Sequence, residues 1–156
     1  MPQTKREREQ RHWLRLRRRA RARLVQALYA WDAVRDRTSF ATVAERFWDD
    51  SALGAEARAF VVPLARFLGT AMPEIDAQLA QRTLNWRPER IGAIERAVLR
   101  LGAAELLAPP SAGEEETPPL AIIQEAVLLA ERFGSDASAR FVNGVLDALG
   151  RHLGRL

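Results

Sequence analysis

The sequence predicts an all-α protein of about seven helices. β-branched residues are few, and no stretch alternates apolar and polar side chains over the length of a strand. Apolar residues instead recur every three or four positions, which is the spacing of one helix face. The 156 residues are 47% hydrophobic, which is enough to form a core.

The first predicted helix is rich in arginine and should end near Asp36. Its apolar residues step by three or four and form one buried stripe: Leu16, Ala20, Leu24, Ala27 and Trp31. A second helix is predicted from Thr38 or Ser39 to about Trp48, with Ser39 as a suitable N-cap.

The third predicted helix covers residues 55–71 and contains Pro63, so we expect a kink or a break there. Pro73 should begin a fourth helix that continues to Leu84, because proline suits the first helical turn. The sequence therefore predicts two helices between residues 55 and 84.

Three further helices are predicted in the second half of the chain. The fifth, over residues 91–107, has apolar residues on more than one face and should be central and mostly buried. Residues 109–119 are rich in Pro and Glu and form a loop. The sixth helix spans residues 120–133, and Ser135 or Asp136 caps the seventh.

Positive charge is concentrated at the start of the chain. Residues 1–24 hold ten Lys or Arg and two Glu, a charge of +8, whereas the whole chain carries only +4. The remainder is therefore slightly acidic. Such asymmetry indicates a partner that is nucleic acid or an anionic membrane surface. Residues 1–16 are expected to form a basic extension, frayed over residues 5–11.

The composition argues against several other classes of protein. The absence of Cys excludes disulfides and thiolate metal sites and fits a cytoplasmic protein. No apolar run approaches a membrane span of about 20 residues. The charged N-terminus does not resemble a signal peptide, and Glu7 and Glu9 argue against a mitochondrial transit peptide.

Catalytic constellations are also missing from the sequence. His12 and His152 lie at opposite ends without metal-binding spacing, and neither a P-loop nor a GxGxxG motif occurs. The glutamates at 114–116 lie in a proline-rich loop where nothing desolvates a catalytic acid. We therefore expect no enzyme, no metal and no cofactor.

Six sequence blocks follow one another along the chain. They are RRRAR (17–21), QALYAW (26–31), IERAVLRL (94–101) with ELL (105–107), PLAIIQEAV (119–127), AERFG (130–134) and FVNGVLD (141–147). In their order and spacing these blocks resemble the NusB family of transcription antitermination factors. Each block alone is a weak signal, but the combination is specific and covers nearly the whole chain. The resemblance implies two packed helical sub-bundles, at about 17–84 and 85–156, within one RNA-binding domain of residues 17–156.

The resemblance also implies a function. Members of the family bind the boxA element of ribosomal RNA leader transcripts as single-stranded RNA, together with the small ribosomal-subunit protein also called NusE. The pair then joins NusA, NusG and RNA polymerase in the cytoplasm. No catalysis, metal or cofactor is implied. This chain is therefore expected to support transcription of ribosomal RNA without being an enzyme.

Site residues follow by matching positions to the family's motifs. The implied RNA contacts are Arg17, Arg18, Arg19, Arg21, Phe141 and Asn143. The implied contacts to the ribosomal protein are Tyr29 and Glu95.

Other roles remain open for several of these residues. Phe141 also fits a core position, Asn143 a structural cap, and Glu95 a surface salt bridge to Arg96 or Arg100. Trp13 could stack on RNA or form a partly buried hydrophobic staple.

The chain departs from the family pattern at four places. Gln124 replaces the usual Asn, and Ala137 stands where some relatives carry an acid. The 109–119 loop is longer and more acidic than usual, and about ten extra residues precede the arginine cluster.

Two other functions remain open. The chain could be a detached NusB-like module of an RNA cytosine methyltransferase, although it ends at Leu156 and lacks the nucleophilic Cys of that enzyme. It could also be a membrane-surface or protein-interaction module with a basic amphipathic helix, which would need a free apolar face on the first helix.

Overall fold

The computed structural model describes residues 1–34, 38–50, 53–84, 86–87, 90–109 and 116–156. The described residues form six α-helices and no strand, which confirms the all-α prediction. The helices are α1 (Lys5–Val34), α2 (Phe40–Asp50), α3 (Ala55–Ala80), α4 (Ala93–Leu107), α5 (Pro119–Phe133) and α6 (Asp136–His152).

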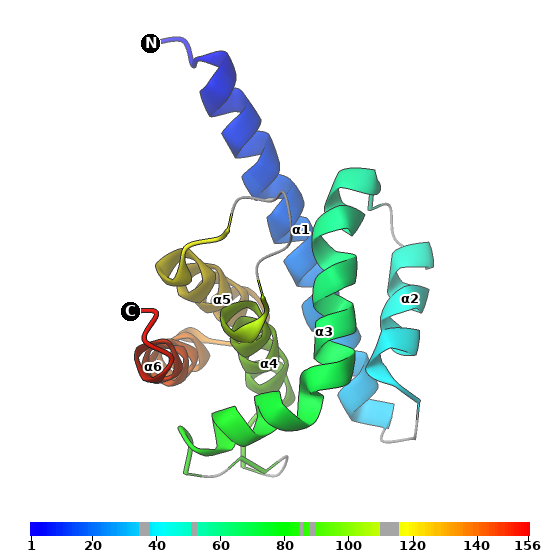
Figure 1. Cartoon of the computed structure of the whole chain (residues 1–156), viewed down its shortest axis with the longest axis vertical. Coiled ribbons are helices and arrows are strands. Elements are labelled where there is room, and N and C mark those ends of the chain that lie inside the picture. Colours follow the sequence, from blue (N-terminus) through cyan, green and yellow to red (C-terminus); the bar gives the residue numbers. More distant parts are fainter. Residues whose placement is uncertain (35–37, 51–52, 85, 88–89, 110–115) are drawn as a thin grey trace.

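The described residues form six helices instead of seven because α3 continues through both of its prolines, Pro63 and Pro73. The prediction of a separate helix from Pro73 is therefore wrong. Each proline removes one backbone hydrogen bond, but the residues around them bury a common stripe that holds the helix together. This stripe consists of Val61, Leu64, Leu68, Met72, Ile75 and Leu79. In Figure 1, α3 bends toward its C-terminal end.

The N-terminal extension is helical rather than frayed. Helix α1 begins at Lys5, and a capping box closes its first turn. The Thr4 backbone N–H donates to a Glu7 carboxylate oxygen (2.8 Å), and the Glu7 N–H donates to the Thr4 hydroxyl (3.2 Å). The N-terminal part of α1 projects beyond the rest of the molecule (Figure 1). The other end of α1 is Val34, and Asp36, its predicted end, lies outside the described residues.

The remaining helix ends follow the sequence closely. The Ser39 hydroxyl accepts the Thr42 N–H at the start of α2 (3.3 Å). Ser135 and Ser138 form a reciprocal capping box at the start of α6. Of the predicted 109–119 loop, residues 110–115 lie outside the described part of the chain.

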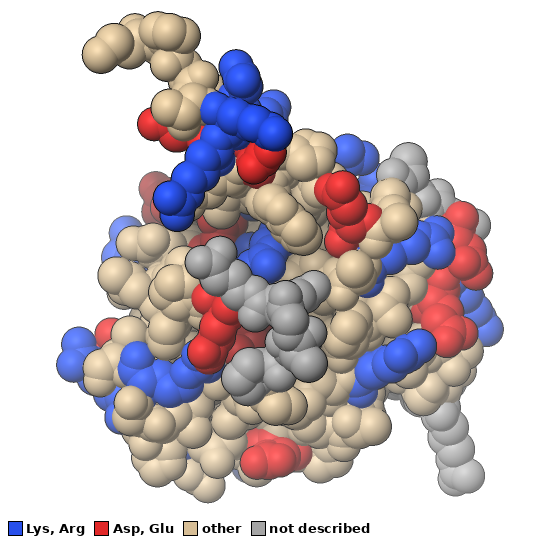
Figure 2. All heavy atoms as spheres, turned by 45° about the horizontal axis from the view of Figure 1, so that its top comes forward, with Lys and Arg blue, Asp and Glu red and all other residues tan. Residues whose placement is uncertain are grey.

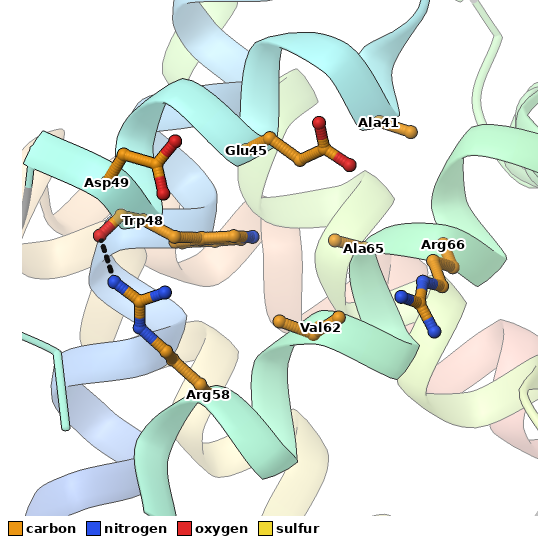
Figure 3. Close-up of a pocket in the computed structure, with 8 residues that line it drawn as sticks. All are labelled: Ala41, Glu45, Trp48, Asp49, Arg58, Val62, Ala65 and Arg66. Carbon is orange, nitrogen blue, oxygen red and sulfur yellow. Dashed lines mark hydrogen bonds between the residues drawn. The ribbon is translucent and has the colours of Figure 1, made fainter. Parts of the chain in front are cut away.

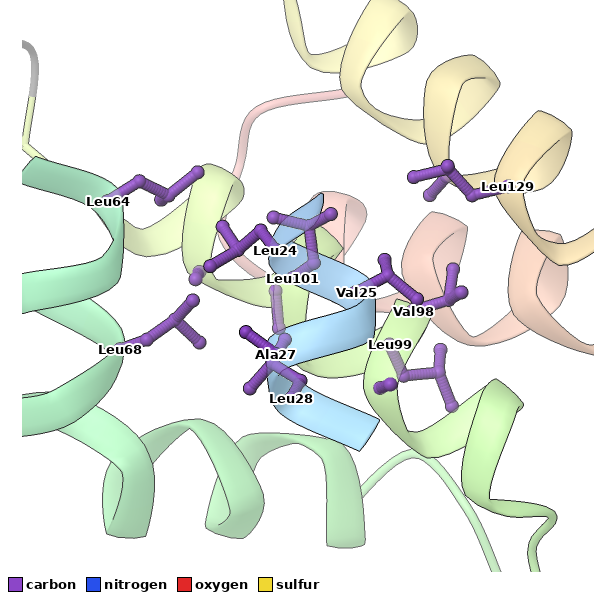
Figure 4. Close-up of a cluster of buried hydrophobic side chains, with 14 of the residues drawn as sticks. Leu24, Val25, Ala27, Leu28, Leu64, Leu68, Val98, Leu99, Leu101 and Leu129 are labelled. Carbon is purple, nitrogen blue, oxygen red and sulfur yellow. The ribbon is translucent and has the colours of Figure 1, made fainter. Parts of the chain in front are cut away.

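Helix α4 lies at the centre of the molecule and packs against α1, α3, α5 and α6. Ten of its fifteen residues are buried, which confirms the predicted central helix. The core joins α1, α3, α4 and α5 through Leu28, Leu68, Leu99 and Leu129 among others (Figure 4). The division into sub-bundles 17–84 and 85–156 stays a prediction, because α4 contacts helices of both groups.

Partly buried ion pairs join α4 to α1 and to α3. Arg96 of α4 pairs with Asp32 at the end of α1. Arg100 pairs with Asp76 of α3, its Nε lying 2.9 Å from Oδ1, and its Nη1 lies 3.4 Å from Asp32 Oδ1. The Arg100 guanidinium also lies over the Trp31 ring, 5.3 Å from its centroid. The position of α1 relative to α4 is therefore set by charge pairing as well as by packing.

Candidate nucleic-acid interface

Five exposed arginines follow one another along the solvent side of α1, and we call them the arginine row. They are spaced by three or four residues, so they share one helix face: Arg8, Arg11, Arg15, Arg19 and Arg23. Lys and Arg side chains also gather on the projecting part of α1 in Figure 2.

The arginine row places like charges next to one another. Each step of four residues along a helix is about 6 Å, and like charges at this spacing destabilise an isolated helix by about 0.2–0.5 kcal/mol per pair. Within the described residues, Arg8, Arg15 and Arg19 have no ion pair or side-chain hydrogen bond, whereas Arg23 donates to Gln26 (2.9 Å). A polyanion lying along the row would neutralise this repulsion.

Arg17 occupies a more enclosed position than the row. Its guanidinium lies between two aromatic rings, 5.3 Å from the centroid of Trp13 and 5.0 Å from that of Phe60. Its Nη1 donates to the Thr117 hydroxyl (2.9 Å), a contact between α1 and the segment before α5. Trp13 therefore contacts a cation, although it stays 41% exposed.

Arg18 reaches across to α5 and forms a bidentate pair with Glu125. Its Nε lies 3.0 Å from Oε2, and its Nη2 lies 3.0 Å from Oε1. The hydrogen bonds to Glu125, followed by the attraction of its charge, raise the pKa of Arg18 above its usual value. The Arg18 side chain is 54% exposed and that of Glu125 only 12%. Arg18 therefore stays cationic and accessible while one carboxylate already neutralises it.

Beside this pair the surface is hollowed between α1 and α5. The hollow has a volume of about 220 Å³ and is lined by Arg18, Arg21, Glu125, Leu128, Leu129 and Arg132. Leu128 is 46% exposed and offers an apolar floor, and the Arg132 side chain is exposed as well. Guanidinium groups beside an apolar floor suit an unstacked base and its phosphate. The sequence did not identify Glu125, Leu128 or Arg132 as site residues, although Glu125 and Arg132 lie within the family motifs, because their partners are far away in the chain.

Arg21 does not belong to this exposed surface. Its side chain is 2% exposed and pairs with Glu105 of α4, Nη2 to Oε1 at 2.8 Å. The guanidinium also lies over the Phe60 ring, 4.9 Å from the centroid. The expected RNA contact at Arg21 is therefore replaced by a buried ion pair, because the turn of the helix directs this residue into the core.

Phe141 and Asn143 are both exposed residues of α6, and Phe141 is 38% exposed. They are two residues apart, so they point in directions about 200° apart around the helix axis. The buried residues Val142 and Val145 lie between those directions on one side. The two residues therefore border opposite edges of the packed face of α6.

Tyr29 and Glu95, the expected partner contacts, differ in their surroundings. Tyr29 is 45% exposed and lies eleven residues, or about three turns, beyond Arg18, so both share one side of α1. Glu95 is half-buried at the start of α4, where its Oε1 accepts a hydrogen bond from the Ser138 hydroxyl (2.6 Å). The alternative salt bridge from Glu95 to Arg96 or Arg100 is wrong, because both arginines pair with aspartates instead.

A second hollow lies between α2 and α3, with a volume of about 290 Å³ (Figure 3). Glu45 and Asp49 of α2 face it from one side, and Arg58 and Arg66 of α3 from the other. Arg58 donates to the backbone oxygen of Trp48 (2.7 Å). This mixture of both charges suits a polyanion less well than the surface of α1.

Neither a cluster of metal ligands nor a membrane-spanning helix occurs in the described part of the chain. Its His, Asp and Glu residues form no group of three or more that could hold a metal ion. None of its helices is both long and apolar enough to cross a membrane.

Together, the fold and this surface define a class: a small all-α protein with a basic first helix suited to binding a polyanion. The sequence profile of the NusB family matches residues 18–151. The chain therefore belongs to the NusB family.

Individual relatives agree with this assignment. The transcription antitermination protein NusB of Sorangium cellulosum is 37% identical over 85% of this chain and 89% of its own length. The NusB protein of Solibacter usitatus is 35% identical over 88% of this chain and 90% of its own length. The match thus spans most of both relatives.

Solved structures of the family share the fold. NusB of T. maritima superposes with a TM-score of 0.74 at 29% identity, over 86% of this chain and 90% of that one. A crystal structure of the antitermination factors NusB and NusE in complex with double-stranded RNA gives a TM-score of 0.73 at 26% identity. The match covers 88% of this chain and 98% of the chain in that structure.

Proposed function

We propose that this protein is a transcription antitermination factor that binds RNA through the exposed side of α1 and the adjoining hollow at α5. The observation that carries the proposal is the C-terminal end of the arginine row, Arg19 and Arg23, beside the Arg18–Glu125 pair. A guanidinium is a planar fork of donors that matches phosphate oxygens, and each neutralised phosphate releases counterions. Rigid attachment to a core helix reduces the entropy lost when the arginines bind.

The RNA proposed is a boxA-type element of a ribosomal RNA leader transcript, bound jointly with the ribosomal protein NusE. The family assignment supports this, as does the similarity to a solved NusB–NusE–RNA complex. That complex contains double-stranded RNA, whereas our proposal is single-stranded RNA, because the hollow beside Leu128 suits an unstacked base. NusA, NusG and RNA polymerase are the wider partners proposed, in the cytoplasm.

Among the expected RNA contacts, Arg18 and Arg19 are the strongest candidates because both are exposed on α1. Arg17 would contribute from its position between two rings, and Phe141 or Asn143 from an edge of α6. Tyr29 is proposed to face NusE. Glu95 is proposed to contact NusE while it also accepts the hydrogen bond from the Ser138 hydroxyl.

Three observations support this function over the alternatives. The matches to antitermination proteins cover about nine-tenths of those relatives, 89% and 90%, which favours a factor of that kind over a methyltransferase module. The apolar stripe of the first helix is buried from Ala20 to Leu28, so it is not available to a membrane. The relatives are named for antitermination rather than for an enzymatic activity, and we propose action by binding alone.

Fluorescence anisotropy tests the proposal. A labelled boxA-like RNA, a scrambled RNA and a duplex of the same sequence are titrated with the protein, with and without NusE. We expect the single-stranded boxA-like RNA to bind most tightly when NusE is present. Equal affinity for all three RNAs would reduce the function to non-specific binding.

The surface is tested with a matched pair of variants. The double variant Arg18→Gln, Arg19→Gln should bind RNA more weakly. The slope of log K against log salt should also become smaller by about 0.7 for each phosphate that the variant no longer neutralises. The control, Arg46→Gln with Arg66→Gln, removes the same charge from exposed sites on α2 and α3. If both double variants weakened binding equally, net charge rather than this surface would be responsible.

A further inference from the structure

The projecting part of α1, residues 5–16, lies outside the segment that matches the NusB family, which begins at residue 18. We call these residues the arm. The first buried residue of α1 is Ala20, so packing in the core begins only beyond the arm. Figure 1 shows the arm extending away from the body.

The arm continues the arginine row without interruption. Arg8, Arg11 and Arg15 belong to the arm, and Arg19 and Arg23 belong to the part packed on the body; all five are exposed. Because α1 is a single helix from Lys5 to Val34, these residues stay in register on one face. From Arg8 to Arg23 the row is about 22 Å long. It therefore reaches well beyond the hollow at Arg18.

The acidic residues of the arm do not neutralise this row. The Glu7 carboxylate accepts a hydrogen bond from the backbone N–H of Thr4. Glu9 pairs with Lys5, whose Nζ lies 4.0 Å from Glu9 Oε1. The arm also contacts α3, where His12 Nε2 lies 3.2 Å from Glu56 Oε2 and both side chains are 60% exposed. Arg8, Arg11 and Arg15 stay exposed beside this contact.

The arm suits RNA better than a lipid surface. A membrane-surface helix needs a continuous apolar face opposite its charges. The arm has only three large apolar residues, Trp13, Leu14 and Leu16. Of these, Trp13 already packs against the Arg17 guanidinium. A row of arginines without such a face is what a phosphate backbone requires.

We propose that the arm is a second, sequence-independent RNA-binding segment that holds the phosphates of nucleotides flanking the element bound at the body. This inference rests on the proposed function, because it takes the RNA already held near Arg18 as its starting point. The arm would lengthen the footprint on the transcript without adding base specificity, since its contacts are to phosphates alone.

The test compares two RNAs and three proteins. The RNAs are the boxA-like element alone and the same element extended by unstructured uridines at both ends. The proteins are the unmodified chain, the arm variant Arg8→Gln, Arg11→Gln, Arg15→Gln, and the control Arg46→Gln, Arg66→Gln, Arg90→Gln, which loses the same charge elsewhere on exposed sites. Glutamine is a good helix former, so circular dichroism should show that the helix content is retained.

We expect the extension to tighten binding by the unmodified chain and by the control, but not by the arm variant. For the extended RNA, the slope of log K against log salt should be smaller by about 2 in the arm variant, at about 0.7 for each phosphate. For the short RNA, the arm variant and the control should have the same slope.

Each contrary result has a distinct meaning. If the unmodified chain bound neither RNA, the proposed function itself would fail. If it bound the short RNA but the extension added nothing, the arm inference alone would be overturned. Sedimentation with vesicles of anionic lipid gives a further outcome. If the unmodified chain sedimented with vesicles, the arm variant did not, and the extension had no effect, the arm would be a membrane-binding segment and our inference wrong.

Discussion

The Arg18 guanidinium and the Glu125 carboxylate join α1 to α5 through three hydrogen bonds of 3.0–3.1 Å, two from Nε and one from Nη2. Both residues line the hollow proposed to bind RNA. A phosphate approaching Arg18 therefore competes with a carboxylate that is already in place. The carboxylate limits how strongly Arg18 can bind an anion, and this has a measurable consequence.

Replacing Glu125 by Gln should tighten RNA binding several-fold, because Arg18 would then pair with phosphate without competition. The slope of log K against log salt should become steeper by up to about 0.7, which corresponds to one additional neutralised phosphate. Glu131→Gln, at an exposed position on the same helix, is the matched control. Equal effects of the two changes would mean that only net charge matters. Weaker binding by Glu125→Gln would mean that Glu125 itself contacts the RNA.

Replacing Arg21 should affect folding rather than RNA recognition directly. Arg21→Gln leaves the carboxylate of Glu105, 7% exposed, without its partner, and should lower the free energy of unfolding by about 3–5 kcal/mol. Urea denaturation followed by circular dichroism measures this value. The double change Arg21→Met, Glu105→Leu should recover much of the stability. Arg23→Gln, on the surface, should stay within about 0.5 kcal/mol of the unmodified chain.

Pro63 lies inside α3 with an exposed side chain. Pro63→Ala should raise the free energy of unfolding by about 2 kcal/mol, since an interior proline costs about 3 kcal/mol relative to alanine and the more flexible unfolded chain offsets part of the gain. Pro119, at the first position of α5, is the control. Proline is favourable at the first helical position, so Pro119→Ala should leave the free energy of unfolding unchanged or lower it slightly. A decrease in the stability of Pro63→Ala would show that α3 needs its proline.

Tyr29 and Glu95 should respond differently to substitution. Tyr29→Ala should abolish or weaken NusE binding, measured by calorimetry, while changing stability by less than about 0.5 kcal/mol, because the side chain is exposed. Glu95→Gln should lower stability by about 1 kcal/mol through the weakened bond from Ser138. Ser138→Ala removes the same hydrogen bond and leaves the carboxylate. If Glu95→Gln and Ser138→Ala affected NusE binding equally, Glu95 would have no direct contact with the partner.

Much of the fold was predictable because it depends on local chemistry. Ser39 and Ser135 cap helices as their residue type suggests, and the apolar periodicity of residues 91–107 indicated the buried central helix α4. The continuity of α3 was not predictable. Local rules disfavour proline inside a helix, and only the shared burial of residues on both sides of Pro63 and Pro73 keeps α3 in one piece.

The candidate site was predictable only as a region. The charge of residues 1–24 and the family motifs pointed to α1, but Glu125 and Arg132 entered the surface through packing of α1 against α5. These partners are more than a hundred residues from Arg18, and no local signal relates them. Phe141 and Asn143 share one motif, yet the turn of α6 places them on different edges of the helix.

By itself, the sequence determined that this protein is all-helical, that its first helix is strongly cationic, and that its motifs are those of the NusB family. Only the tertiary structure decided what each arginine of that helix does. Arg17 lies between two rings, Arg18 pairs with α5, Arg19 faces solvent, and Arg21 pairs in the core. The reason is that successive residues turn by about 100° around a helix, so neighbours in sequence meet different helices or none.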